Sequence, residues 1–216
     1  MKSDTNHNIG DKQNTDGGIL RCHKTNSHFL AYLFRMKYIN RWSLMRNTNT
    51  ENIAEHSLEV AVISHLLAII KNTYFGGNLD PNKVAVFAMF HDASEIITGD
   101  MPTPIKYFNP EINLAYKNIE EIANQKLLSM LPCELKNLYK KILFFTDEES
   151  LSIVKAADKL AAYIKCIEEE KAGNKEFLKA KEAIFSSISK TDLPEVKYFI
   201  QTFIDSFSLT LDELDY

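Results

Sequence analysis

Apolar residues recur at helical spacing through most of the chain from Ser27 onward. In the segment HFLAYLFRMKYIN they fall three or four residues apart and share one helix face; these are Phe29, Leu33, Met36 and Ile39. No stretch alternates long enough to indicate a strand, and no internal repeat is visible. The pattern predicts a single all-α domain with helices at about 28–40, 53–74, 81–98, 110–131, 134–144, 147–171, 175–188 and 194–207.

Several of these helices begin at residues that cap a helix N-terminus. Asn52 with Glu55, and Thr146 with Glu149, have the spacing of a capping box. Asp80-Pro81 and Asn109-Pro110 each combine a capping side chain with a proline suited to the first helical position. Between 99 and 107 the segment GDMPTPIKY has two prolines and cannot continue a helix. The helix over 81–98 is therefore expected to end near Gly99.

The first 26 residues differ from the rest of the chain, because they are polar and carry almost no apolar side chains. We predict a disordered N-terminal tail over 1–26 and one folded domain over 27–216. The tail has no apolar core and is therefore no signal peptide, and the apolar run over 61–70 is too short to span a membrane. Three widely separated cysteines favour reduced thiols. We expect a cytoplasmic protein without a membrane partner.

Net charge also limits the function. The formal charge is −4 and no long basic run occurs, which argues against a nucleic-acid partner. The content of 45% hydrophobic and 25% charged residues is ordinary for a globular domain.

The pair His91-Asp92 stands in the apolar run AVFAMFHDASEII. Burial of an ionised carboxylate without a partner is very costly, and a bound cation would explain the adjacent imidazole as well. His56 and Asp158 also lie on or beside apolar helix faces. One such aspartate alone is more often the partner of a buried base or backbone donor. Two histidines and two aspartates together favour an octahedral divalent metal site with positions open to water.

His65 is a competing ligand. It follows His56 by nine residues, and this spacing puts the two imidazoles on opposite faces of one helix. Both cannot reach the same ion. Its apolar neighbours favour a core histidine.

The ordered set His56, His91-Asp92 and Asp158 resembles the signature of the HD-domain metal-dependent phosphohydrolases. The segments INRWSLMRNTNTENIAEHSLEVA, FHDASEIITGDMPTPIKYFN and KAADKLAAYIKCIEE further resemble the bacterial 5′-deoxynucleotidases of the YfbR-like family, and the resemblance runs from about Ser27 to Asp215. It implies an HD-domain helical bundle with its metal site between helices. It also implies removal of phosphate from 2′-deoxyribonucleoside 5′-monophosphates with one divalent ion, Co²⁺ or Mn²⁺, and a homodimer.

The same resemblance implies roles for individual residues. His56, His91, Asp92 and Asp158 would hold the ion. Arg41 would orient the phosphate, for which a guanidinium fork is suited. Trp42, the single tryptophan, would lie against the sugar and exclude a 2′-hydroxyl.

Glu95 and Asp100 are the acid–base candidates, and their roles stay undivided. Glu95 is four residues after His91 and would share its helix face. The pocket would be lined by these residues: Arg41, Trp42, His56, Glu95, Asp100, Met101, Pro102 and Thr103. Lys106 and Arg46 would assist phosphate binding or be solvated.

Three other functions compete. Another HD-domain phosphohydrolase would act on a dNTP or a signalling nucleotide such as a guanosine polyphosphate, but extra phosphates call for more cationic residues than the pocket segments offer. A di-iron bundle would need Glu-x-x-His pairs, and no histidine here has a glutamate three residues before it. An inactive binding module is disfavoured by the intact ligand set.

Overall fold

The computed structural model describes residues 26–214, and these are almost entirely helical. The predicted all-α fold is confirmed: the described residues form no strand, and one isolated bridge joins Asn40 to Asn52. The predicted tail lies outside this range except for its last residue. The elements are α1 (Phe29–Leu33), η1 (Phe34–Tyr38), α2 (Ile53–Tyr74), α3 (Pro81–Met89), α4 (Glu95–Thr98), α5 (Thr103–Lys106), α6 (Pro110–Ser129), α7 (Cys133–Leu143), α8 (Glu148–Lys171), η2 (Lys175–Phe177), α9 (Leu178–Ser189), α10 (Pro194–Phe203) and η3 (Ile204–Ser208).

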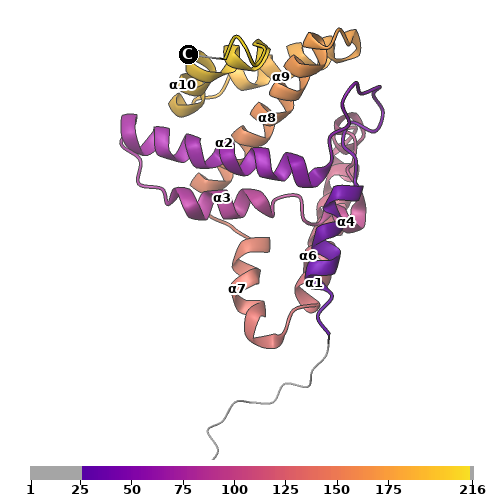
Figure 1. Ribbon diagram of the computed structural model, residues 1–216. Coiled ribbons are helices and arrows are strands. Elements are labelled where there is room, and N and C mark those ends of the chain that lie inside the picture. The colour runs from indigo at the N-terminus through magenta and orange to yellow at the C-terminus, as the bar shows by residue number, and fades with distance from the viewer. Residues whose placement is uncertain (1–25, 215–216) are drawn as a thin grey trace, which may run out of the picture.

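Helix α2 is the centre of the fold. It packs against α3 along one side, is crossed by α8, and carries α10 on the opposite side from α3 (Figure 1). The side chains between these helices form the larger of two apolar cores, which includes Val60, Leu67, Val84, Ile153 and Leu160. By length and composition α2 would also pass for a membrane span, but 56% of its most apolar window is buried within the fold. It is a core helix.

A second, smaller core lies between α1, α6 and α7. It is formed by Phe29, Ala93, Leu127, Leu131 and Leu143. In Figure 1 these helices stand to one side of and below the α2–α3 pair. The predicted ligands His91 and Asp92 lie where the two cores meet. Ala88, shortly before them, packs in the larger core, and Ala93, directly after them, packs in the smaller one.

The helix predicted over 81–98 is interrupted, which corrects the sequence-based expectation. Helix α3 ends at Met89, residues 90–94 form turns, and α4 resumes at Glu95 for four residues. Val84 and Phe87 of α3 pack in the larger core, whereas Ala93 packs in the smaller one. One straight helix cannot place its side chains in both cores, so the chain changes direction at His91-Asp92.

Most predicted helix starts are confirmed. The capping box of α2 is present, and the side chains of Asp80 and Asn109 cap α3 and α6. The box predicted for Thr146 and Glu149 is wrong. Asp147 is the N-cap of α8 instead, and its carboxylate accepts a hydrogen bond from the Ser150 hydroxyl at 2.6 Å. His65 is half-buried rather than in the core.

Candidate active site

The first turn of α2 holds His56 in a fixed position. The Asn52 side chain accepts hydrogen bonds from the backbone N–H groups of Ala54 and Glu55 at 3.0 and 3.1 Å, and the Glu55 carboxylate accepts one in return from the Asn52 N–H. This reciprocal cap satisfies donors that a helix start otherwise leaves unpaired. His56 follows in the same turn and is fully buried.

His91 lies in the turn after α3, and its ring is oriented by the backbone. Its Nδ1 is 2.7 Å from the carbonyl oxygen of Ala88. Because a carbonyl only accepts hydrogen bonds, Nδ1 carries a proton, and in the neutral ring Nε2 then has the free lone pair. The Nε2 atom is thereby available as a metal ligand.

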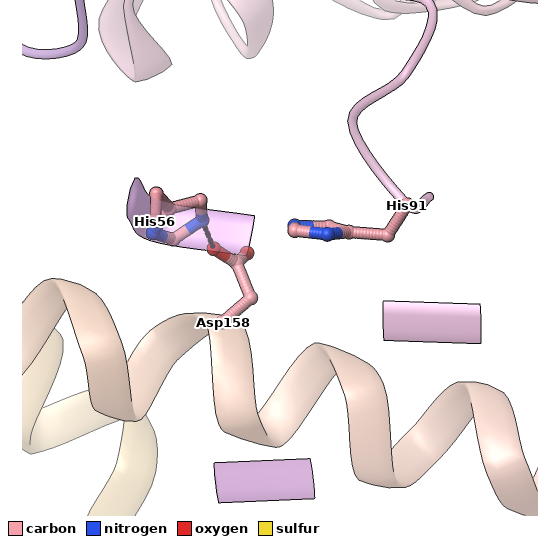
Figure 2. Close-up of side chains that lie close together, drawn as sticks. All are labelled: His56, His91 and Asp158. Carbon is pink, nitrogen blue, oxygen red and sulfur yellow. Dashed lines mark ion pairs between the residues drawn. The ribbon is translucent and has the colours of Figure 1, made fainter. Parts of the chain in front are cut away.

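Asp158 on α8 completes a compact group with the two histidines (Figure 2). One ligand atom from each of His56, His91 and Asp158 lies within 4.8 Å of the other two. Asp158 Oδ1 is 3.0 Å from His56 Nε2, and the Asp158 side chain is 42% exposed, so the group is open to solvent on that side.

The donor set of this group fits a divalent metal. The Nε2 atoms of His56 and His91 are buried and make no well-oriented hydrogen bond within the described chain. Imidazole nitrogen together with carboxylate oxygen is the ligand type of Mn, Fe, Co and Zn. The carboxylates of Asp158 and Glu51 outweigh the opposing effect of burial and raise the pKa of His56 to about 9. The same negative charges that stabilise the proton on His56 would also stabilise a bound metal cation.

Asp92 borders the same space. Its Oδ2 lies 3.1 Å from His91 Nε2 and 3.7 Å from His56 Nε2. It is also 3.5 Å from a guanidinium nitrogen of Arg41. Burial opposes its ionisation, but the two imidazoles and Arg41 lower the pKa of Asp92 overall. Asp92 is outside the three-membered group, and its role as a fourth ligand stays a prediction.

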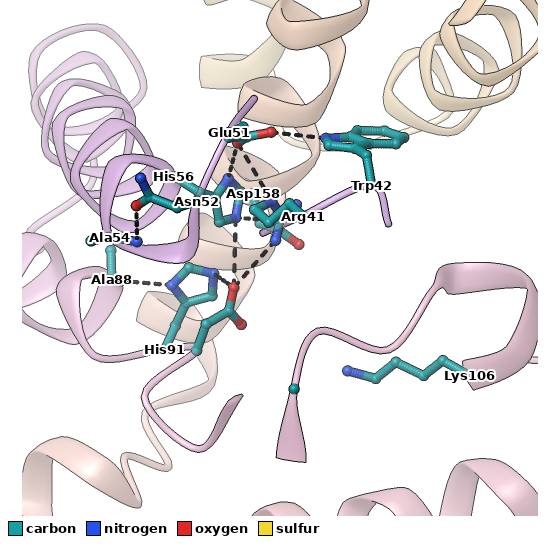
Figure 3. Close-up of polar contacts among 12 residues, drawn as sticks. Arg41, Trp42, Glu51, Asn52, Ala54, His56, Ala88, His91, Lys106 and Asp158 are labelled. Carbon is teal, nitrogen blue, oxygen red and sulfur yellow. Dashed lines mark hydrogen bonds and ion pairs between the residues drawn. The ribbon is translucent and has the colours of Figure 1, made fainter. Parts of the chain in front are cut away.

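The segment after η1 carries Arg41 and Trp42 to this site (Figure 3). The backbone N–H of Arg41 donates to the carbonyl of Glu51 at 2.9 Å, beside the bridge between Asn40 and Asn52. Its side chain is only 13% exposed. Trp42 has a φ of 58°, which few residues other than glycine adopt. Its ring packs on Phe177, with the ring centroids 5.2 Å apart.

Glu51 is a buried residue of the candidate site that sequence reasoning missed. Its side chain is buried, and the indole N–H of Trp42 donates to Glu51 Oε2 at 2.8 Å. Glu51 Oε1 lies 3.2 Å from His56 Nδ1 and 3.4 Å from Arg41 Nε. In the sequence Glu51 sits in a polar stretch just before a helix cap, where a solvated side chain is the ordinary expectation. The only local signal is that Glu51 stands directly before the Asn52 cap and five residues ahead of the candidate ligand His56.

Glu95 and Asp100 interact electrostatically with Asp92 and Arg41, although the helix break removes the continuous helix on which a shared face was predicted for His91 and Glu95. Glu95 is buried, and burial together with Asp92 and Asp100 raises its pKa to about 10. Burial also raises the pKa of Asp100, against the effect of Arg41. Both carboxyl groups are thus electrostatically linked to the candidate metal site. Gly99 between them adopts a φ of 74°, and the Tyr116 hydroxyl donates to its carbonyl at 3.3 Å.

The remaining predicted residues are less closely associated with the group. Met101 and Pro102 are half-buried after Asp100, and Thr103 is exposed. Lys106 is paired with Glu120 at 3.0 Å and stands apart from the polar cluster in Figure 3. Arg46 is 93% exposed and paired with Glu176 at 2.8 Å. Each of these two cations is paired with a carboxylate outside the His56–His91–Asp158 group.

Similar helical folds are found among the HD-domain phosphohydrolases. The structure is similar to an HD-domain phosphohydrolase from Listeria innocua, with a TM-score of 0.74 and 21% identity over 83% of this chain and 88% of that one. It is also similar to a cyanophage S-2L HD phosphohydrolase described as bound to dA and one catalytic Zn²⁺ ion, with a TM-score of 0.57, 21% identity, and coverage of 82% and 96%. The fold is therefore that of the HD-domain class.

Sequence similarity narrows the class to one family. Residues 28–207 match the family described as 5′-deoxynucleotidase YfbR-like. A 5′-deoxynucleotidase of Yersinia pseudotuberculosis is 54% identical over 190 residues, covering 87% of this chain and 96% of its own length. One from Cronobacter sakazakii is 53% identical over 191 residues with the same coverage. The chain belongs to the YfbR-like 5′-deoxynucleotidase family of metal-dependent hydrolases, as the sequence motifs predicted.

Proposed function

We propose that this protein hydrolyses 2′-deoxyribonucleoside 5′-monophosphates to a deoxyribonucleoside and inorganic phosphate. The observation that carries the proposal is the combination of the His56–His91–Asp158 group with a buried guanidinium and a tryptophan on one adjoining segment. Similarity to enzymes named 5′-deoxynucleotidases over most of their length supports the same activity.

His56, His91, Asp92 and Asp158 would hold one divalent ion, with Co²⁺ or Mn²⁺ proposed. Such an ion, when bound, polarises a phosphate oxygen and lowers the pKa of the attacking water. The side chains themselves orient the phosphate and exclude a 2′-hydroxyl. Asp92 and Glu51 hold Arg41 in place, and its remaining guanidinium N–H groups can donate to the phosphate.

Trp42 would discriminate between deoxyribose and ribose by leaving no room for a 2′-hydroxyl. The contacts of its ring with Phe177 and Glu51 restrain the indole and support this role. An indole ring that could move aside would discriminate poorly against a ribose 2′-hydroxyl.

Glu95 and Asp100 are proposed as the acid–base pair. Burial raises the pKa of both groups; a carboxyl group that keeps its proton near neutral pH can donate it to the leaving 5′-oxygen, whereas one that has lost its proton can accept one from water. Met101, Pro102 and Thr103 would line the sugar and base side of the pocket, and His56 would contact substrate from the metal side.

We also propose a cytoplasmic homodimer. The free thiols of Cys133 and Cys166 in the described chain suit a reducing compartment. Leu30, Phe34 and Tyr38 form an apolar stripe along α1 and η1, each more than half exposed, which is a surface that association can bury.

Phosphate release from a panel of substrates tests the activity. After chelation and addition of Mn²⁺ or Co²⁺, we expect release from dNMPs, far less from NMPs and dNTPs, and none without metal. Trp42→Ala should lower the ratio of kcat/KM for dAMP to that for AMP by about 10–100-fold, because a cavity replaces the wall. Comparable release from dAMP and AMP by the wild-type protein would contradict the role of Trp42. Faster release from a dNTP would favour the alternative HD-domain activity.

A further inference from the structure

The Glu51 carboxylate lies between the candidate metal site and the candidate sugar site. The side chain is 7% exposed, and its two oxygens face different groups. Oε1 is 3.2 Å from Nδ1 of His56 and 3.4 Å from Nε of Arg41, whereas Oε2 accepts the indole N–H of Trp42 at 2.8 Å (Figure 3). One buried side chain thus contacts a metal ligand, the phosphate-binding residue and the sugar-facing residue.

We propose that Glu51 is a positioning residue that couples metal binding to selection of deoxyribose. The inference rests on the proposed function, because it takes the roles of His56, Arg41 and Trp42 from there. A carboxylate beside one imidazole nitrogen fixes the tautomer and the ring plane, and it directs the other nitrogen toward the ion. For His56 that other nitrogen is the Nε2 that faces Asp158.

The same carboxylate restrains Trp42. The backbone of Trp42 has a φ of 58°, a conformation that persists in a non-glycine residue only when its surroundings hold it. The hydrogen bond to Glu51 and the ring contact with Phe177 are two such restraints. Releasing the indole N–H therefore frees the ring to move from its place against the sugar.

Glutamine at position 51 tests whether the polar contacts of the carboxylate, rather than the size of the side chain, hold His56 and Trp42 in place. Its side chain has the same length, but one of its oxygens is replaced by an NH₂ group that donates. The Trp42 indole donates a hydrogen bond to Glu51 Oε2, and His56 Nδ1 and Arg41 Nε lie within ion-pair distance of Oε1, so the NH₂ group of glutamine would meet a donor on one side or the other. No rotamer of glutamine can accept from both sides.

The test compares three variants in two assays. The first assay is Co²⁺ binding without substrate, followed by visible absorption of the bound ion. The second is the ratio of kcat/KM for dAMP to that for AMP. The variants are Glu51→Gln, Trp42→Phe and Glu176→Gln. The last is the matched control, because Glu176 pairs with Arg46 on the same segment without contacting His56 or Trp42.

We expect Glu51→Gln to weaken Co²⁺ binding by about 10–100-fold, the usual cost of losing an outer partner of a metal ligand, and to lower the dAMP/AMP ratio as well. Trp42→Phe keeps an aromatic ring but loses the N–H group, so it should lower the ratio and leave Co²⁺ affinity unchanged. Glu176→Gln should change neither.

A Glu51→Gln protein that loses one property alone, or neither, overturns the coupling. If this variant does not fold, as judged by thermal unfolding, Glu51→Asp is measured in the same way. It keeps the charge but shortens the side chain by one methylene, and both properties should again fall together. A wild-type ratio near one would instead refute the proposed role of Trp42, and the Co²⁺ assay would still decide whether Glu51 positions His56.

Discussion

Asp158 shows at the scale of a single residue how an apolar helix face can carry an ionised group. Its neighbours Val154, Ala157 and Ala161 are buried, yet its carboxylate is partly open to solvent and lies 3.0 Å from His56 Nε2. Burial raises the pKa of Asp158, and the contact with His56 more than offsets that effect and lowers it. The group is therefore ionised and available as a ligand at neutral pH.

Asp158→Asn tests this residue with little change of shape. The neutral amide removes a ligand charge, so Co²⁺ affinity should fall by more than the roughly 10–100-fold that an outer partner costs. Calorimetric titration of the chelated protein measures it. Asp147→Asn on the same helix is the control, because Asp147 contacts Ser150 and lies away from the site. Equal affinities for wild type and Asp158→Asn would remove Asp158 from the ligand set.

At the scale of an element, the N-terminus of α2 links helix stability to ligand placement. Asn52 caps the helix, and its carbonyl accepts the backbone N–H of His56 at 3.1 Å. Fraying of this first turn would displace the imidazole from Asp158 and His91. The cap thus contributes to the geometry of the site as well as to the stability of the fold.

Asn52→Ala should lower the free energy of unfolding by about 1 kcal/mol, the typical value for a lost N-cap, and weaken Co²⁺ binding several-fold. Asn109→Ala is a matched control. It removes the N-cap of α6, whose side chain accepts from the Ile112 N–H at 2.7 Å, and α6 carries no proposed ligand. Urea unfolding and metal titration should show a similar loss of stability for both variants, but weaker binding only for Asn52→Ala. Identical Co²⁺ affinities for the two variants would show that the Asn52 cap does not affect the metal site.

At the scale of the whole molecule, Glu169 fastens the segment that carries Trp42 to helix α8. This buried carboxylate accepts hydrogen bonds from the Thr48 and Asn49 N–H groups at 2.8 and 3.1 Å, from Asn174 at 2.7 Å and from Lys165 at 2.5 Å. Burial alone would raise the pKa of Glu169, but these donors lower it to about 2. The irregular segment is thus tied to the core by a charged network.

This shift predicts a pH-dependent stability. A carboxyl group whose pKa is depressed on folding stabilises the folded state above its unfolded pKa, near 4.5, and that stabilisation is lost as the pH falls toward 2. A shift of this size corresponds to about 3 kcal/mol. The difference in unfolding free energy between wild type and Glu169→Gln should therefore shrink by that amount between pH 6 and pH 2, measured by urea unfolding. Parallel curves for the two proteins would contradict the prediction.

Local signals along the chain were sufficient to predict much of this protein. Helix α2 has the predicted bounds, and the caps at Asn52, Asp80 and Asn109 are as expected, because periodicity and capping depend on residues within one or two turns. The motif residues His56, His91 and Asp158 were identified from residue type, apolar setting and order along the chain. They do converge in the structure.

Other features depend on packing between distant segments. Nothing between Asn82 and Thr98 breaks a helix locally, yet the chain turns at 90–94 because α3 and Ala93 pack in different cores. Glu51 likewise reads as a solvated residue until Arg41, Trp42 and His56 enclose it. The sequence by itself determined most of the helices, the family and the group His56, His91 and Asp158, since each is encoded in local spacing or motif. Only the tertiary structure decided where the helix breaks and that Glu51 is buried against Arg41, Trp42 and His56, because burial and charge contacts arise between segments far apart in the chain.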